Sequence, residues 1–304
     1  PMTTLVFGHK SPDTDSTGSP IIWAWYLNEI KGVAAAPALL GEPNTEALFM
    51  LDHWKLEIID DVQADQPVVI VDTNNPAELP ASINDADITA IIDHHRLVGG
   101  LETKGPVNIV METLACTATI MYKMIGDDMA QMPENIKGAM LTCILSDTLE
   151  FRSPTTTQED TAIAHALAKD LGVDIAEYAA QMFAAKSDVS SFSEAELLRM
   201  DSKEYEVGGK KFRVSVLETT SPATVLNRKD ALMAAMPGVA TEDGADQVLL
   251  FVVDILNEEA TMLIPNDFTK SVAEKSFGAT VTGDSVVLPG VMSRKKQIIP
   301  NIKA

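Results

Sequence analysis

The residues best suited to chemistry lie close together near the N-terminus. His9, Asp13 and Asp15 occur within seven residues, directly after the apolar residues 5–7. A loop that leaves a buried strand can aim an imidazole and two carboxylates at one point, which is how a protein binds a divalent cation. This stretch therefore predicts a metal site.

Further candidate ligands follow other apolar segments at the point where each segment ends. They are Asp72 after residues 68–71, Asp93, His94 and His95 after residues 88–92, and Asp147 after the helical residues 140–145. The carboxyl ends of parallel strands meet at one edge of a sheet, so groups distant in the sequence should converge there. A carboxylate at a helix C-terminus opposes the helix dipole, so Asp147 needs a compensating cation.

Each of these residues also has an ordinary explanation. A single aspartate after a strand is more often a helix cap or a turn residue than a ligand. However, three of the five histidines of the chain lie in these segments beside aspartates, which favours a shared site. The other two, His53 and His165, lie in amphipathic helices and are assigned no chemistry.

The ligand types indicate which metal and which reaction to expect. Several carboxylates with one or two imidazoles and no thiolate favour octahedral Mn²⁺ or Mg²⁺ over tetrahedral Zn²⁺. The ligands outnumber the needs of one ion, so we expect two ions about 3.5–4 Å apart that share carboxylates and hold a hydroxide between them. Such sites displace groups at phosphorus or hydrolyse amides.

Basic residues near the C-terminus could supply the other half of a phosphate site. Residues 293–297, Ser-Arg-Lys-Lys-Gln, contain the only run of three basic residues in this acidic chain and have apolar residues on both sides. A solvated tail is the ordinary explanation, but the apolar neighbours favour an ordered segment, and a guanidinium beside an ammonium suits phosphate oxygens. Lys203 by itself has the pattern of an ordinary surface lysine.

These residues must be positioned by an α/β fold. The first half of the chain alternates strand-length apolar runs with helix-length segments, which is typical of a mostly parallel sheet with helices on both faces. The expected strands are 4–7, 36–40, 67–71, 88–92 and 107–111. The expected helices are 16–31, 44–53, 117–125, 133–146, 159–171 and 174–183, the first of them capped by Asp15 or Ser16.

A polar, serine-rich stretch at residues 187–193 marks the boundary between two domains. It separates a metal-binding domain, residues 1–186, from a smaller α/β domain, residues 194–304. In the second domain we expect strands at 211–217, 247–255 and 260–264 and helices at 230–240 and 267–277. A chain of 304 residues, 46% of them apolar, can form two separate cores.

Composition excludes several classes of function. The net charge of −21 argues against a broad nucleic-acid surface, because phosphate backbones are bound by basic surfaces. The apolar stretches are too short to cross a membrane and no export signal is visible, so we expect a cytoplasmic protein without nucleic-acid or membrane partners. Cys116 and Cys143 lack the spacing of a zinc site or redox pair and are expected to be buried free thiols.

Together these motifs resemble those of the family II, manganese-dependent inorganic pyrophosphatases of the DHH phosphoesterase superfamily. The matching segments are Gly8-His9-x-x-Pro12-Asp13-Thr14-Asp15-Ser16, Val71-Asp72, Ile92-Asp93-His94-His95-Arg96, Ser146-Asp147-Thr148, Phe151-Arg152-Ser153-Pro154-Thr155 and Ser293-Arg294-Lys295-Lys296-Gln297. The Asp-His-His sequence alone indicates only the superfamily. The C-terminal motif is far more specific.

The resemblance implies a role for each candidate residue. The implied metal ligands are His9 and Asp13 for one ion, Asp15 and His94 for the other, and Asp72 and Asp147 for both. The implied catalytic and substrate-binding residues are His95, Lys203, Arg294 and Lys295. Asp93 would support the neighbouring histidines from behind.

The resemblance also implies an enzyme that hydrolyses pyrophosphate to two phosphates by in-line attack of the bridging hydroxide. It implies two Mn²⁺ ions per subunit, replaceable by Co²⁺ or Mg²⁺, further Mg²⁺ bound with the substrate, a homodimer, and an active site in a hinged cleft between the domains. Thr73, Asn75 and Ser11 stand where the family commonly has His, Glu and Asn, and they bear on metal preference. The twenty residues between Asp72 and Asp93 leave no room for a CBS regulatory pair.

Two other functions stay open on the sequence alone. Another DHH phosphoesterase would act on short polyphosphate, a nucleotide or the end of a single-stranded nucleic acid, but the acidic chain and its three tryptophans offer little for stacking bases. A non-catalytic, metal-dependent binding protein would keep the ligand cluster and release no phosphate.

Overall fold

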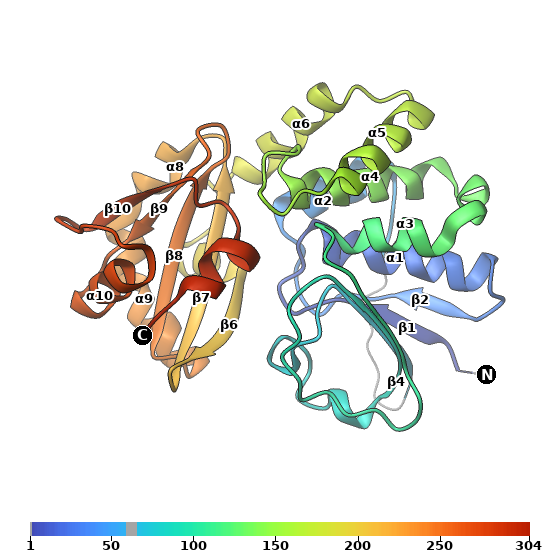
Figure 1. Ribbon diagram of the computed structural model, residues 1–304, viewed down its shortest axis with the longest axis horizontal. Coiled ribbons are helices and arrows are strands. Elements are labelled where there is room, and N and C mark those ends of the chain that lie inside the picture. The colour runs from blue at the N-terminus through green and yellow to red at the C-terminus, as the bar shows by residue number, and fades with distance from the viewer. Residues whose placement is uncertain (1, 59–65) are drawn as a thin grey trace. The chain divides into compact units, whose positions relative to one another are not determined.

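The chain forms two compact units, one ending at Met182 and one running from Phe183 to Ala304 (Figure 1). The structure is a computed structural model that describes residues 2–58 and 66–304. The division falls inside helix α6 (Ile175–Ser187), and the linker at 187–193 stays a prediction. In the described ranges no helix is both long and apolar enough to cross a membrane.

The first unit is built on a five-stranded parallel sheet, which confirms the predicted α/β class. Its strands are β1 (Thr4–Phe7), β2 (Ala35–Pro37), β3 (Pro67–Val71), β4 (Asp87–Asp93) and β5 (Asn108–Met111). They lie in the order β2-β1-β3-β4-β5, so the strand order reverses between β1 and β3. A ligand crevice at the carboxyl ends of the strands is expected at such a point.

Helices cover one face of this sheet. They are α1 (Thr14–Glu29), α2 (Thr45–Trp54), α3 (Thr117–Ile125), α4 (Glu134–Thr148), α5 (Gln158–Leu171) and α6. Helix α1 lies against β1 and β3, and α4 packs on α1 (Figure 1). The other face, which includes Leu5, Phe7 and Ile70, packs against Leu79, which directly follows the short 3₁₀ helix Pro76–Glu78, and against Ile83 of the 3₁₀ helix Ile83–Asp85. Two-sided cover explains why these strands are continuously apolar.

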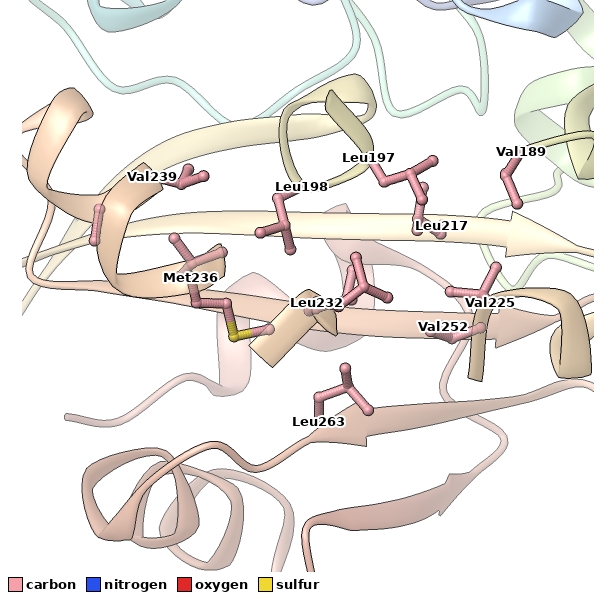
Figure 2. Packing of buried hydrophobic residues seen from close by; sticks show 13 residues of the cluster. Val189, Leu197, Leu198, Leu217, Val225, Leu232, Met236, Val239, Val252 and Leu263 are labelled. Atoms are coloured by element: carbon pink, nitrogen blue, oxygen red, sulfur yellow. The ribbon is translucent and has the colours of Figure 1, made fainter. Parts of the chain in front are cut away.

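The second unit contains a mixed five-stranded sheet. Its strands are β6 (Ser202–Val207), β7 (Lys210–Thr219), β8 (Gln247–Asp254), β9 (Glu259–Leu263) and β10 (Ser285–Pro289), and its helices include α7 (Glu194–Met200), α8 (Pro222–Leu226), α9 (Lys229–Asp243) and α10 (Asp267–Phe277). Only the β7–β8 pair is parallel. Figure 2 shows part of its core, where Leu198 of α7, Leu217 of β7 and Leu232 of α9 meet.

Two strands and two α-helices of this unit were missing from the prediction: β6, β10, α7 and α8. β6 and β10 are the two terminal strands of their sheet, and β6, Ser-Lys-Glu-Tyr-Glu-Val, is mostly polar. Edge strands are paired on one side only and need little apolar patterning, so periodicity does not find them. Val189, inside the predicted linker, also packs into the core of Figure 2.

Candidate metal centre

The ends of three neighbouring strands deliver the first group of candidate ligands. His9 lies two residues beyond β1, Asp72 directly follows β3, and Asp93 is the last residue of β4. Because β1 and β3 flank the point where the strand order reverses, His9 and Asp72 border the expected crevice. The convergence inferred from the sequence is therefore present among the described residues.

Asp72 stands between the two histidines. Its Oδ2 lies 3.5 Å from His9 Nε2, and its Oδ1 lies 3.0 Å from His94 Nε2. Its backbone has a φ of 60°, in the left-handed region that non-glycine residues rarely adopt and that aspartate tolerates better than most. The strained turn directs the two oxygens of one buried carboxylate to two separate groups.

The remaining ligands complete these two groups. In the first, Asp13 Oδ2 lies 3.6 Å from His9 Nε2. In the second, Asp15 Oδ2 and Asp147 Oδ2 lie 3.7 Å and 3.9 Å from His94 Nε2. One ligand atom from each residue lies within 4.8 Å of the others in three sets among the described residues: His9, Asp13 and Asp72; Asp15, His94 and Asp147; and Asp72, Asp93, His94 and His95. Each set could hold a metal ion, and the third set, which contains both Asp72 and His94, links the other two.

The start of helix α1 divides Asp13 from Asp15. The prediction that Asp15 or Ser16 caps this helix is wrong, because Asp13 is the cap. Oδ1 of Asp13 accepts hydrogen bonds from the Ser16 backbone N–H and hydroxyl, both within 2.9 Å, while Oδ2 faces His9. Asp15 falls in the first turn and points to His94. Two carboxylates two residues apart thus face different groups.

Burial and mutual repulsion dominate the electrostatics of the second group. Burial, followed by the charge of Asp72, raises the pKa of Asp15 to about 6. Burial, followed by the charges of Asp15 and Asp72, raises the pKa of Asp147 well above its ordinary range. The carboxylates therefore share a site whose negative charge is not balanced by protein groups alone.

Contacts behind the histidines fix their orientation. His94 Nδ1 lies 3.1 Å from the carbonyl of Leu114, which can only accept, so Nδ1 carries the proton and Nε2 is turned to the carboxylates. Asp93 Oδ1 accepts from the His95 backbone N–H at 3.2 Å and lies 2.6 Å from His95 Nδ1. Asp93 Oδ2 accepts from Asn74 at 2.7 Å.

These contacts fit divalent cations. A neutral His94 with its proton on Nδ1 would point a lone pair at Asp72 Oδ1 only 3.0 Å away, which requires positive charge between them. Asp147 Oδ2 is buried and accepts no hydrogen bond from any described residue. Metal-bound histidines commonly donate their other N–H to a backbone carbonyl, as His94 does to Leu114.

The predicted substrate-binding residues of the second unit gather at one edge of its sheet. Lys203 lies on β6 opposite Val214 of β7, and it is 5% exposed, so its description as an ordinary surface lysine is wrong. Arg294 donates to the Asp201 carbonyl at 2.8 Å, to Asp201 Oδ1 at 3.0 Å and to the Val214 carbonyl at 3.4 Å. Asp201 and Arg294, which are 93 positions apart in the chain, are thus held next to each other.

The ends of the Ser-Arg-Lys-Lys-Gln motif shape the segment that carries its basic residues. Ser293 caps a short turn of π-helix (Arg294–Ile298) by accepting from the Lys296 N–H at 3.1 Å. Gln297 accepts from the Met292 and Ser293 N–H groups and donates to the Gly290 carbonyl. The segment is ordered, as its apolar neighbours predicted, and Lys295 is half-buried within it.

Apart from Asp93, sequence reasoning missed the residues that support the ligands. Thr117, the first residue of α3, donates its backbone N–H to Asp15 at 2.9 Å, and its hydroxyl lies 3.3 Å from Asp72. A helix N-terminus favours a carboxylate there. No spacing rule connects residues 102 positions apart, so only the expected start of a helix at Thr117 hinted at this contact.

The residues assigned no metal chemistry lie in other surroundings. His53 packs among the rings of Phe49, Trp54 and Tyr178, and His165 stacks on Phe151. Cys116 and Cys143 are buried free thiols, as expected, and burial raises the pKa of both well above the usual range.

Two family models match the chain, one in each half. Residues 3–147 match the N-terminal domain of the DHH family, and residues 180–304 match the DHHA2 domain. The chain thus has the two-domain arrangement of a DHH-family protein.

Relatives that match almost the whole chain show which family within the DHH proteins it belongs to. The chain is 36% identical over 301 residues to a Lactobacillus acidophilus protein that is named "Probable manganese-dependent inorganic pyrophosphatase", covering 97% of this chain and 96% of the relative. It is 39% identical over 307 residues to a Deinococcus radiodurans protein of the same name, covering 98% and 97%. A crystal structure of a family II inorganic pyrophosphatase from Methanococcus jannaschii superposes with a TM-score of 0.88 at 30% identity, covering 98% of each chain. The protein belongs to the family of manganese-dependent inorganic pyrophosphatases.

Proposed function

We propose that this protein hydrolyses inorganic pyrophosphate to two phosphates with two Mn²⁺ ions per subunit. The observation that carries the proposal is the division of Asp72 between two histidines, 3.5 Å on one side and 3.0 Å on the other. One carboxylate shared by two groups of ligands is the arrangement that a two-metal site requires.

The proposed ligands follow the two groups. His9 and Asp13 bind one ion, and Asp15 and His94 bind the other. Asp72 is shared by both ions, and we propose the same for Asp147. When bound, the ions lower the pKa of a water molecule and neutralise charge on the phosphates.

The protein's own residues orient the substrate. We propose that His95, held by Asp93, donates a hydrogen bond to a phosphate oxygen. Lys203 and Lys295 of the second domain contribute positive charge. Arg294, whose guanidinium is held by Asp201, binds a phosphate group together with these lysines. We also propose that additional Mg²⁺ enters with the substrate and that residues 187–193 link the two domains.

We further propose a cytoplasmic homodimer. A reducing compartment suits the buried thiols Cys116 and Cys143. β5 is the last strand of its sheet, and its residue Ile109 is 55% exposed. Leu97, in the segment between β4 and β5, is 75% exposed. An edge strand with exposed apolar side chains can pair with a second copy.

Size-exclusion chromatography with light scattering tests the dimer. Ile109→Asp should convert the dimer to a monomer, and a monomeric wild type would refute the dimer.

Phosphate release by metal-stripped protein reconstituted with Mn²⁺, Co²⁺ or Mg²⁺ tests the function. We expect pyrophosphate to be preferred over tripolyphosphate and over a dinucleotide, with the highest rate in Mn²⁺. Preference for one of the other substrates would indicate a different DHH phosphoesterase. Tight Mn²⁺ binding without phosphate release would indicate a binding protein.

A further inference from the structure

Glu46 is a buried carboxylate that belongs to neither group of metal ligands. It lies in the first turn of α2 and is fully buried. One of its oxygens, Oε1, accepts a hydrogen bond from the Thr14 hydroxyl at 2.6 Å and a short one from the Ser146 hydroxyl. A carboxylate is costly to bury, so its retention here calls for an explanation.

The two donors occupy informative places in the chain. Thr14 lies between Asp13 and Asp15, at the start of α1. Ser146 directly precedes Asp147, in the last turn of α4. Glu46 therefore joins the two helix ends that bring ligands to the metal centre, although its donors are 132 positions apart in the sequence.

The segment that carries Glu46 also supports the loop before α1. The Asn44 backbone N–H donates to the Pro12 carbonyl at 2.9 Å, and the Asn44 side chain caps α2. A Cβ atom on Gly41 would lie only 2.6 Å from the Lys10 carbonyl oxygen, so the glycine permits this close approach. Residues 41–46 thus contact the loop through backbone groups as well as through Glu46.

We propose that Glu46 is a positioning residue for the metal centre: it fixes the distance between the helix ends that carry Asp13, Asp15 and Asp147. This inference rests on the proposed function of the site as a two-metal centre. Metal ligands must be held to within about half an ångström, so a tie between their helices affects affinity directly. The effect is geometric and requires an acceptor at Oε1, not a negative charge.

Four proteins test the proposal: wild type, Glu46→Ala, Glu46→Gln and Thr142→Val. Glu46→Gln keeps an oxygen that can accept from both hydroxyls and removes the charge. Thr142→Val is the matched control, because Thr142 also ties α4 to α2, through Trp54 Nε1 at 3.3 Å, and to Tyr178 of α6, but makes no hydrogen bond to α1, all of which the structure describes. Binding of Mn²⁺ alone to the metal-stripped proteins is measured by calorimetry, with urea unfolding and pyrophosphate turnover in parallel.

We expect Glu46→Ala to weaken Mn²⁺ binding about 10- to 100-fold, as removal of supporting contacts does in other metal sites. Glu46→Gln should stay within about threefold of wild type, because its acceptor remains. Thr142→Val should lose stability and keep its Mn²⁺ affinity. Wild-type affinity in Glu46→Ala, an equal loss in Glu46→Gln, or an equal loss in Thr142→Val would each overturn the proposal.

The wild-type measurements distinguish failure of the Glu46 proposal from failure of the proposed function. If wild type itself fails to bind Mn²⁺ or to release phosphate, the proposed function fails; if wild type does both and Glu46→Ala matches it, only the role of Glu46 fails. Should Glu46→Ala not fold, Thr14→Val removes one donor at constant shape. We expect it to weaken Mn²⁺ binding about tenfold, and unchanged binding would overturn the proposal.

Discussion

The metal-free protein should become less stable as the pH rises through the range where Asp15 loses its proton. Burial and the charge of Asp72 raise its pKa from the ordinary value of 3.8 to about 6. The folded protein therefore binds this proton more tightly than the unfolded chain does. The stabilisation is complete below about pH 4 and is lost as the pH rises through about 6.

The size of the effect follows from the shift. A difference of about two pKa units corresponds to about 3 kcal/mol in the free energy of unfolding. Asp147, whose pKa is also raised, acts in the same direction. Bound Mn²⁺ should reverse the trend, because metal binding releases these protons and strengthens as the pH rises.

Urea unfolding of metal-free wild type and Asp15→Asn between about pH 4 and pH 7 measures this contribution. Asp15→Asn keeps only part of the hydrogen bonding to Ser19 and Thr117, so its stability is lower at low pH, and the informative quantity is the slope. The net charge of −21 adds a general loss of stability with pH in both proteins, which high salt reduces. Equal slopes in the two proteins would refute the reasoning.

The remaining predictions concern the site and the packing behind it. Asp72→Asn should weaken Mn²⁺ binding by at least about 100-fold and abolish turnover, since it removes a carboxylate that faces both groups. If calorimetry shows that Asp72→Asn binds Mn²⁺ as tightly as wild type, Asp72 is not shared by the two ions. Lys295→Ala should raise the KM for pyrophosphate and leave Mn²⁺ affinity unchanged, and loss of the metals with normal substrate kinetics would show that the roles are divided wrongly. Gly8→Ala would place a Cβ atom 2.7 Å from Ser16 Cβ, so thermal unfolding should show a loss of about 1–3 kcal/mol together with weaker Mn²⁺ binding.

The strands and most ligands could be predicted because their signals are local. β1, β3 and α3 have the bounds expected from the sequence, since each is an apolar or helical run with clear ends. The placement of His9 and Asp72 followed from one rule about parallel sheets, which needs only the positions of strand ends. The resemblance to a known family then assigned the basic residues of the second domain.

Other features depend on contacts that no local pattern encodes. Asp13, rather than Asp15, caps α1, because the backbone turns into the helix two residues earlier than expected. Lys203 is buried because a polar edge strand forms beside β7, and the alternation within β6 is too weak to reveal it. Glu46 gave no signal at all, since its partners lie on two other helices.

The sequence by itself determined which chemical groups are available: carboxylates and imidazoles at strand ends and a basic segment near the C-terminus. It also determined the alternation of strands and helices in which these groups lie. Local patterns suffice for this, because strand ends and helix starts are set by neighbouring residues. The family resemblance implied how the ligands are divided, but only the tertiary structure decided the geometry of that division, with Asp72 in a left-handed turn between His9 and His94. That division depends on packing between elements far apart in the chain, which fixes angles and distances that spacing cannot supply.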